Sequence, residues 1–208
     1  MSPSSRSMSW NIGRALVVGL AALGSGCALT SRGEALDVRF FTPEAAHATV
    51  ATTGVPAGPS LRLGRVRSGP DLGQRIVHGD GAYEVGYYED RRWTERPALY
   101  LRRALDRTLF EDRGFRRELG GECPALEAEL LVFEEVKTPA AHEARIVVRI
   151  EIATDHVLFT DTVTVVEPVT GDRFEAVVAA MARALDGTAE EIARRVGGAL
   201  AKPVSALP

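Results

Sequence analysis

The N-terminal region carries the feature that most constrains how this chain can fold. Arg6 and Arg14 supply positive charge with no acidic residue, and residues 15–23 form an apolar run. This run has the length of the hydrophobic region of a signal peptide and is too short to span a bilayer. Small residues then lead directly into Cys27. The pattern predicts that residues 1–26 are removed and that the domain folds without them.

This N-terminal pattern resembles a lipoprotein signal peptide with its lipobox. In such signals the cysteine thiol receives a diacylglycerol, cleavage exposes the cysteine amine, and that amine is acylated. The resemblance implies that Cys27 is the lipid attachment site. The alternative is an ordinary secretory signal in which the cysteine is incidental. Two or three acyl chains give stable membrane attachment. Because Ala28 follows the cysteine where an aspartate would resemble an inner-membrane retention signal, the expected location is the periplasmic face of the outer membrane.

Cleavage would leave 182 of the 208 residues, enough for one domain with a core. The formal net charge of −3 would become −5, because two arginines are lost. This balance argues against a nucleic-acid-binding protein, which carries a basic excess. We divide the chain into a signal peptide (1–26), the lipidated cysteine with a tether (27–35), a folded domain (36–202) and a tail (203–208).

The two cysteines are Cys27 and Cys123. If Cys27 carries lipid, Cys123 has no partner within the chain and no internal disulfide can form. Cys123 lies in a predicted turn, where it is either a half-buried small residue or an exposed thiol able to pair with another chain. The fold is therefore expected to depend on its hydrophobic core.

Alternating apolar and polar residues predict a series of strands. These strands are residues 36–40, 60–66, 75–78, 82–88, 126–133, 145–152 and 156–166. Gly79, Asp80 and Gly81 separate two of them and predict a hairpin turn, because glycine and aspartate tolerate positive φ. Residues 44–60 are rich in Ala, Thr, Gly and Pro and predict a loop.

Two stretches have helical periodicity. Leu101, Leu105 and Leu109 recur every fourth residue and predict an amphipathic helix that ends near Gly114, with Thr94 as its N-cap. Arginines on this helix form either a solvated face or a surface for anionic head groups or an acidic partner. A final helix begins near residue 172. Its apolar stripe comprises Phe174, Val177, Val178, Met181, Leu185, Ile192, Val196 and Leu200, and Gly187 marks a potential bend.

The order of these elements is strands, helix, three strands, helix. It predicts an α+β fold, a single layered domain with a mostly antiparallel sheet and two long helices packed on one face. The sequence contains no nucleophile elbow, Walker loop, dinucleotide fingerprint or HExxH motif. The four histidines lack ligand spacing, and the acidic pair Glu134-Glu135 is expected to be solvated. We therefore predict no catalytic residue, no metal and no cofactor, so the protein is expected not to be an enzyme.

A series of short motifs resembles the ABC-type transport auxiliary lipoproteins. The motifs are GQRIV at residues 73–77, YYE at 87–89, RW at 92–93, the leucine-rich helix after them, and FEA at 174–176. The resemblance covers nearly all of the mature chain. Members of this family are the lipoprotein partners of mammalian-cell-entry (MCE) transport systems, including the paraquat-inducible and toluene-tolerance types.

The resemblance implies a non-enzymatic, lipid-anchored subunit of an MCE-type ABC system that moves lipids between inner and outer membranes. The implied role is to dock the MCE conduit at the outer membrane, with an ABC permease and an ATPase as indirect partners and no nucleic acid. The alternative is an independent envelope lipoprotein that scaffolds another assembly or export complex.

Four residues are candidates for docking a partner. These are Tyr87, Tyr88, Arg92 and Trp93, since Trp and Tyr are favoured anchors at interfaces. The alternative for Trp93 is a structural role, in which it fastens the start of the first helix to the sheet.

Overall fold

The computed structural model describes residues 36–44 and 57–201. The chain divides into two compact units, residues 1–37 and 38–208, and the second unit holds every described strand and helix. The predicted lipidation site Cys27 and most of the predicted loop at 44–60 lie outside the described residues. Within the described part of the chain, no helix is long and apolar enough to cross a membrane.

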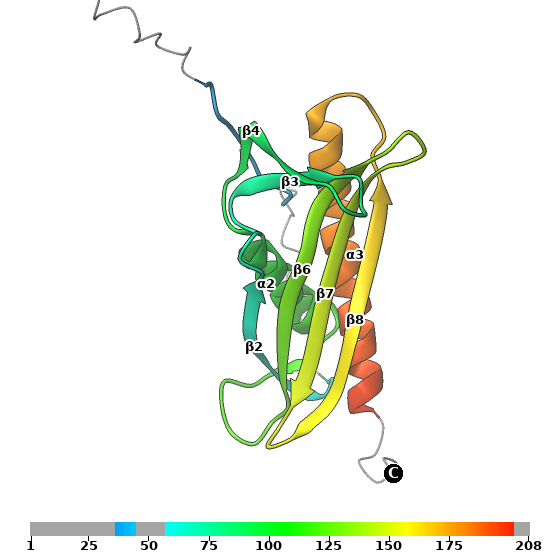
Figure 1. Cartoon of the computed structure of the whole chain (residues 1–208). Helices are drawn as coiled ribbons and strands as arrows, with labels where there is room; N and C mark the ends of the chain where they lie inside the picture. Colours follow the sequence, from blue (N-terminus) through cyan, green and yellow to red (C-terminus); the bar gives the residue numbers. More distant parts are fainter. Residues whose placement is uncertain (1–35, 45–56, 202–208) are drawn as a thin grey trace, which may run out of the picture. The chain divides into compact units, whose positions relative to one another are not determined.

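The described residues of the second unit form an eight-stranded sheet and two α-helices (Figure 1). The strands are β1 (Arg39–Phe41), β2 (Ser60–Ser68), β3 (Arg75–Gly79), β4 (Val85–Trp93), β5 (Arg116–Arg117), β6 (Ala125–Lys137), β7 (His142–Ala153) and β8 (Val157–Pro168). The helices are α2 (Pro97–Arg107), extended by the π-helical turn η1 (Thr108–Asp112), and α3 (Phe174–Leu200). The predicted α+β class is confirmed.

Strand β6 is the centre of the sheet. On one side it pairs with β7, which pairs with β8, and both pairings are antiparallel, as predicted. On its other side β6 pairs in parallel with two strands in succession. Strand β2 pairs near the beginning of β6 (Arg62 with Ala125), and β3 pairs near its end (Gly79 with Val136). The sheet therefore contains both parallel and antiparallel pairs, and different strands, β2 and β3, flank the two ends of β6.

The core lies between the sheet and the helices. Ile146, Val148, Ile150 and Ile152 of β7 are 0% exposed, so the predicted alternation is confirmed. Helix α3 packs along β7 and β8, and Figure 1 shows it behind these strands. The helix runs through Gly187 without interruption. Burying each of these aliphatic side chains contributes roughly 1.5–3 kcal/mol relative to leaving it exposed.

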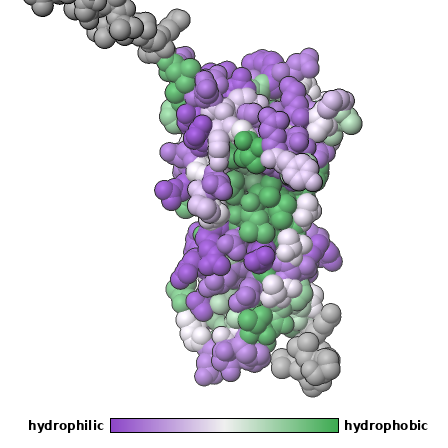
Figure 2. Space-filling model, in the orientation of Figure 1, coloured by the Kyte–Doolittle hydropathy of each residue, from purple (hydrophilic) through white to green (hydrophobic). Residues whose placement is uncertain are grey.

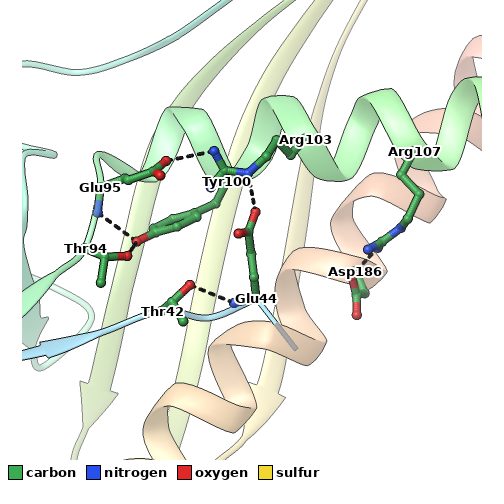
Figure 3. Close-up of polar contacts among 8 residues, drawn as sticks. All are labelled: Thr42, Glu44, Thr94, Glu95, Tyr100, Arg103, Arg107 and Asp186. Atoms are coloured by element: carbon green, nitrogen blue, oxygen red, sulfur yellow. Dashed lines mark hydrogen bonds and ion pairs between the residues drawn. The ribbon is translucent and has the colours of Figure 1, made fainter. Parts of the chain in front are cut away.

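The start of α2 differs from the prediction. Arg96, not Thr94, is the N-cap, with extended backbone (φ −70°, ψ 138°), because the following Pro97 disfavours helical geometry in the residue before it. The Thr94 hydroxyl instead lies 2.7 Å from the hydroxyl of Tyr100, which also accepts the backbone N–H of Glu95 at 2.9 Å (Figure 3). The predicted end near Gly114 is confirmed, since this glycine has a φ of 64° after η1.

Ion pairs connect α2 to neighbouring parts of the chain (Figure 3). Arg103 donates to Glu44 at 2.6 Å and to Glu95 at 2.8 Å, and these contacts, led by Glu44, raise the pKa of Arg103. Arg107 donates to Asp186 of α3 at 2.7 Å. These two arginines therefore fix the segment after β1 and helix α3 against α2.

Candidate functional site

Trp93 belongs to the core and not to the surface. Its side chain is 1% exposed, and its ring packs edge-on against Phe133 of β6 and Tyr100 of α2. The alternative structural role is therefore confirmed, and the prediction that Trp93 is a docking anchor is wrong. Physically, Trp93 ends β4 just before α2 begins, so the turn between them places its side chain between helix and sheet.

Tyr88 joins a buried polar cluster. Its hydroxyl donates to Glu135 Oε2 at 2.5 Å, and Glu135 Oε1 lies 2.6 Å from His142 Nε2. Burial, together with this hydrogen bond, raises the pKa of Tyr88 well above its usual value. Phe174, the first residue of α3, packs on one part of the Tyr88 ring, and His78 packs on another. The cluster joins β3, β4, β6, β7 and α3.

The acidic pair at the end of β6 is buried, contrary to the prediction of a solvated pair. Glu134 is 7% exposed and Glu135 is 2% exposed. Their side chains point to opposite faces, because successive strand residues alternate. Glu134 is paired with Arg145. The β3–β4 turn lies over Val136 on that face, where a Cβ added at Gly81 would approach Val136 Cγ1 to 2.9 Å.

Tyr87 and Arg92 are partly exposed and have contacts within the domain. The guanidinium of Arg75 lies 4.3 Å from the centre of the Tyr87 ring. Arg92 Nη1 donates to the backbone carbonyls of Tyr88 and Arg91, at 2.6 and 2.8 Å. The docking role of Tyr87, Tyr88 and Arg92 stays a prediction. The structure brings all three to β4, but directs Tyr88 into the buried cluster.

The hairpin also exposes two residues that no sequence motif singles out. Tyr83 is 98% exposed and Val85 is 61% exposed. They alternate with Tyr87, and we call Tyr83, Val85 and Tyr87 the hairpin surface. Asp80 Oδ1 accepts the backbone N–H groups of residues 82, 83 and 84 at 2.8–3.0 Å, which lowers the pKa of Asp80 and fixes the turn. The alternation of Tyr83, Val85 and Tyr87 with other residues is the sequence pattern from which this surface can be predicted.

A second exposed apolar region lies on the sheet face that α3 does not cover. Figure 2 shows hydrophobic side chains in the middle of this face, with hydrophilic residues around them. Leu131, at a bulge in β6, is 38% exposed, and Val166 of β8 is 43% exposed. Val132 and Val147 pair between them on the same face. We call these four residues the open sheet face.

The fold is shared with proteins of known structure, although no curated protein matches the chain. Protein XCC0632 from Xanthomonas campestris, of the DUF330 family, superposes with a TM-score of 0.61 at 20% identity, over 78% of this chain and 95% of that one. A second crystal structure, of an uncharacterized protein, gives a TM-score of 0.56 at 13% identity, over 76% and 97% of the two chains. At these identities the likeness shows the fold alone.

The family is shown by the sequence itself. The model of the family described as ABC-type transport auxiliary lipoprotein component matches residues 41–193, which include all the strands from β2 to β8 and most of α3. The resemblance stated from the short motifs is thereby confirmed. This chain belongs to the family of ABC-type transport auxiliary lipoprotein components.

Proposed function

We propose that this protein is a non-enzymatic, lipid-anchored subunit of an MCE-type ABC transport system that moves lipids between the inner and outer membranes. Its membership of the auxiliary lipoprotein family is the observation that carries the proposal. The lipobox ending at Cys27 supports attachment to a membrane, and Ala28 favours the periplasmic face of the outer membrane. The partner is an MCE-domain protein, with the permease and ATPase as indirect partners.

The hairpin surface is the docking site that we propose for the MCE-domain protein. Exposed aromatic residues supply much of the binding energy at protein interfaces, and Tyr83 is almost fully exposed. The edge of β4 before Arg91 is also open, because within the described residues β1 pairs with β4 only at Arg91–Trp93. A partner segment could therefore gain both aromatic contacts and backbone hydrogen bonds there.

Rigidity of the hairpin favours this assignment. A surface that is already ordered loses little conformational entropy when it binds. Asp80 fixes the turn, and Tyr88 ties the middle of β4 to Glu135 in the core. The turn passes over Val136 on the same face of the sheet as the open sheet face, and the Glu134–Arg145 ion pair lies between them. The open sheet face is therefore a second, separate apolar area that a partner can cover.

Site-directed photo-crosslinking in intact cells tests the proposal. A benzophenone amino acid replaces Tyr83, and the same amino acid replaces Val157, which is 55% exposed at the start of β8, as the matched control. We expect the probe at position 83 to crosslink an MCE-domain protein and the probe at 157 to give much less of that adduct. An affinity pull-down from detergent-solubilised envelopes should recover the same protein with its permease and ATPase.

Two results would count against the proposal. Recovery of an unrelated envelope complex, with the MCE protein present in the cells but absent from the eluate, overturns the assignment to MCE transport. Recovery of the MCE protein without a crosslink from position 83 retains the transport role and removes the hairpin surface as its docking site.

A further inference from the structure

An arginine-lined cavity of about 400 Å³ lies at the edge of the sheet formed by β2. Strand β5 pairs with Ser60 and Leu61 of β2, and among the described residues no strand pairs with that edge of β2 beyond them. Four arginines line the cavity. They are Arg62 and Arg65 of β2, Arg102 of α2 and Arg117 of β5. The volume falls within the usual range of small-molecule sites.

Two of the four arginines are held in place by the protein. Arg117 donates two hydrogen bonds to Asp106 of α2, at 2.5 and 2.8 Å. Arg102 donates to the backbone carbonyl of Gly64, at 2.8 Å, and so caps part of the open edge of β2. The walls of the cavity are therefore connected to α2 and to β5, and the site is built before any ligand arrives.

The other two arginines lack such partners. Within the described residues, no hydrogen bond or ion pair engages the guanidinium group of Arg62 or Arg65, and Arg62 Nε is a buried donor without an acceptor. A buried N–H left unpaired costs roughly 1–3 kcal/mol, because it has lost its hydrogen bonds to water. Two glutamates also line the cavity, and one of them, Glu118, accepts a hydrogen bond from Ser60. An anionic oxygen in the cavity would supply the missing acceptor.

The cavity also has an apolar side. Leu63 and Leu119 belong to its lining, and Leu119 is 90% exposed in the segment between β5 and β6. Planar guanidinium groups match the geometry of phosphate oxygens, and they bind phosphate bidentately. The combination of convergent guanidinium groups with an exposed leucine matches a ligand that is anionic at one end and apolar at the other.

We propose that this cavity binds the phosphate group of an anionic phospholipid and that Leu119 contacts the apolar part of the lipid. The cavity lies at the beginning of β6, whereas the hairpin surface lies at its end, as the positions of β2 and β3 in Figure 1 show. The lipid site and the partner site can therefore be occupied together. The lipid proposal does not depend on the identity of the partner.

Direct binding measurements on the mature lipoprotein in detergent test the site. The probes are short-chain phosphatidylglycerol, short-chain phosphatidylcholine, inorganic phosphate and an acidic peptide. We expect phosphatidylglycerol to bind at least about tenfold more tightly than the other three. The double variant Arg62→Gln/Arg65→Gln should weaken phosphatidylglycerol binding about tenfold or more, the loss expected for charge-assisted hydrogen bonds. Leu119→Ala should weaken phosphatidylglycerol binding and leave phosphate binding unchanged.

A charge-matched double variant, Arg149→Gln/Arg173→Gln, serves as the control, because both arginines lie on exposed surfaces away from the cavity. It should bind phosphatidylglycerol as the unaltered protein does. If Arg62→Gln impairs folding, as judged by circular dichroism, the exposed Arg65→Gln alone provides the test. Equal affinities for inorganic phosphate and phosphatidylglycerol would overturn the lipid assignment. Preference for the acidic peptide would overturn it in favour of a protein partner.

Discussion

Charged side chains near the two ends of β6 differ in their burial and in their pairing. At the C-terminal end, Glu134 and Glu135 are buried, and each has a partner on the neighbouring strand β7, Arg145 and His142 respectively. Near the N-terminal end, the neighbouring strand carries Arg62 and Arg65, whose guanidinium groups have no partner within the described residues. A buried donor without an acceptor, such as Arg62 Nε, costs free energy that a paired one does not. The difference indicates that the first end stabilises the fold and the second retains donors for a ligand.

Removal of the Trp93 side chain should have the largest effect on the stability of the domain. Trp93→Ala should lower the free energy of unfolding by roughly 3–5 kcal/mol, because a fully buried aromatic ring leaves a cavity. Trp93→Phe should cost less than about 1.5 kcal/mol, since it also removes the indole N–H, which has no hydrogen-bond partner in the described structure. Urea denaturation followed by far-ultraviolet circular dichroism measures both.

The matched control for Trp93 is the exposed aromatic residue of the same hairpin. Tyr83→Ala should change the free energy of unfolding by less than about 0.5 kcal/mol. A large effect at Tyr83, or a negligible one for Trp93→Ala, would contradict the division between a buried anchor and a free surface.

Removal of the carboxylate from the buried cluster should have the next largest effect. Glu135→Ala leaves the hydroxyl of Tyr88 and the ring of His142 without their shared acceptor, and should destabilise the domain by roughly 2–3 kcal/mol. The same urea titration measures it. Glu151→Ala, an exposed position on β7, is the control and should be nearly neutral. Equal effects at the two positions would show that the cluster does not hold the end of the sheet together.

Substitutions of the cavity arginines should leave the free energy of unfolding nearly unchanged, in contrast to substitutions in the buried cluster. Arg65→Gln should change the free energy of unfolding by less than about 0.5 kcal/mol, because Arg65 is exposed and its guanidinium has no hydrogen bond or ion pair to another described residue. Arg62→Met should be neutral or stabilise by up to about 1 kcal/mol, since an unpaired buried donor disappears. Thermal melts with and without phosphatidylglycerol provide the readout. Strong destabilisation of both variants would assign these arginines to the structure and not to a ligand.

The smallest effect on stability is expected for Glu191, a paired surface carboxylate that lies away from both ends of β6. Arg194 and then Arg195 hydrogen-bond the carboxylate of Glu191 on α3 and lower its pKa to about 2. Because its pKa in the folded state lies below the ordinary value of 4.5, the pair stabilises the domain above pH 4.5 and loses this contribution as pH falls toward 2. Solvent screens such a pair, so Glu191→Gln should cost less than about 1 kcal/mol at pH 7.

The pH dependence of stability in Glu191→Gln checks this last expectation. The difference in unfolding free energy from the unaltered protein should shrink between pH 5 and pH 2. Arg183→Gln, which removes a surface arginine elsewhere on α3, serves for comparison. A difference that grows as the pH falls would contradict the sign derived from the lowered pKa.

Much of the fold was predictable because its signals are local. The alternation of Ile146, Val148, Ile150 and Ile152 gave both the strand and its buried face, and the stripe on residues 174–200 gave α3. The N-cap of α2 was misplaced because Thr94 suits a cap, while the proline that follows Arg96 restricts the backbone more strongly. These patterns act over a few residues, so they can be read without knowing the tertiary structure.

The candidate sites were less predictable because their residues meet only after folding. An acidic pair such as Glu134-Glu135 is usually solvated. Here it is buried, and its partners Tyr88, His142 and Arg145 come from β4 and β7, which the sequence separates from it. The cavity requires β2, α2 and β5 to converge, and nothing in the spacing of its arginines reveals this.

The sequence by itself determined the element order, the periodic core and membership of the auxiliary lipoprotein family, and it predicts the lipobox at Cys27. The tertiary structure decided which charges are buried, that Trp93 is core, and that β2 and β3 join opposite ends of β6 in parallel. The physical reason is the range of the interactions. Periodicity and propensity depend on neighbours along the chain, whereas burial and electrostatic pairing depend on neighbours in space.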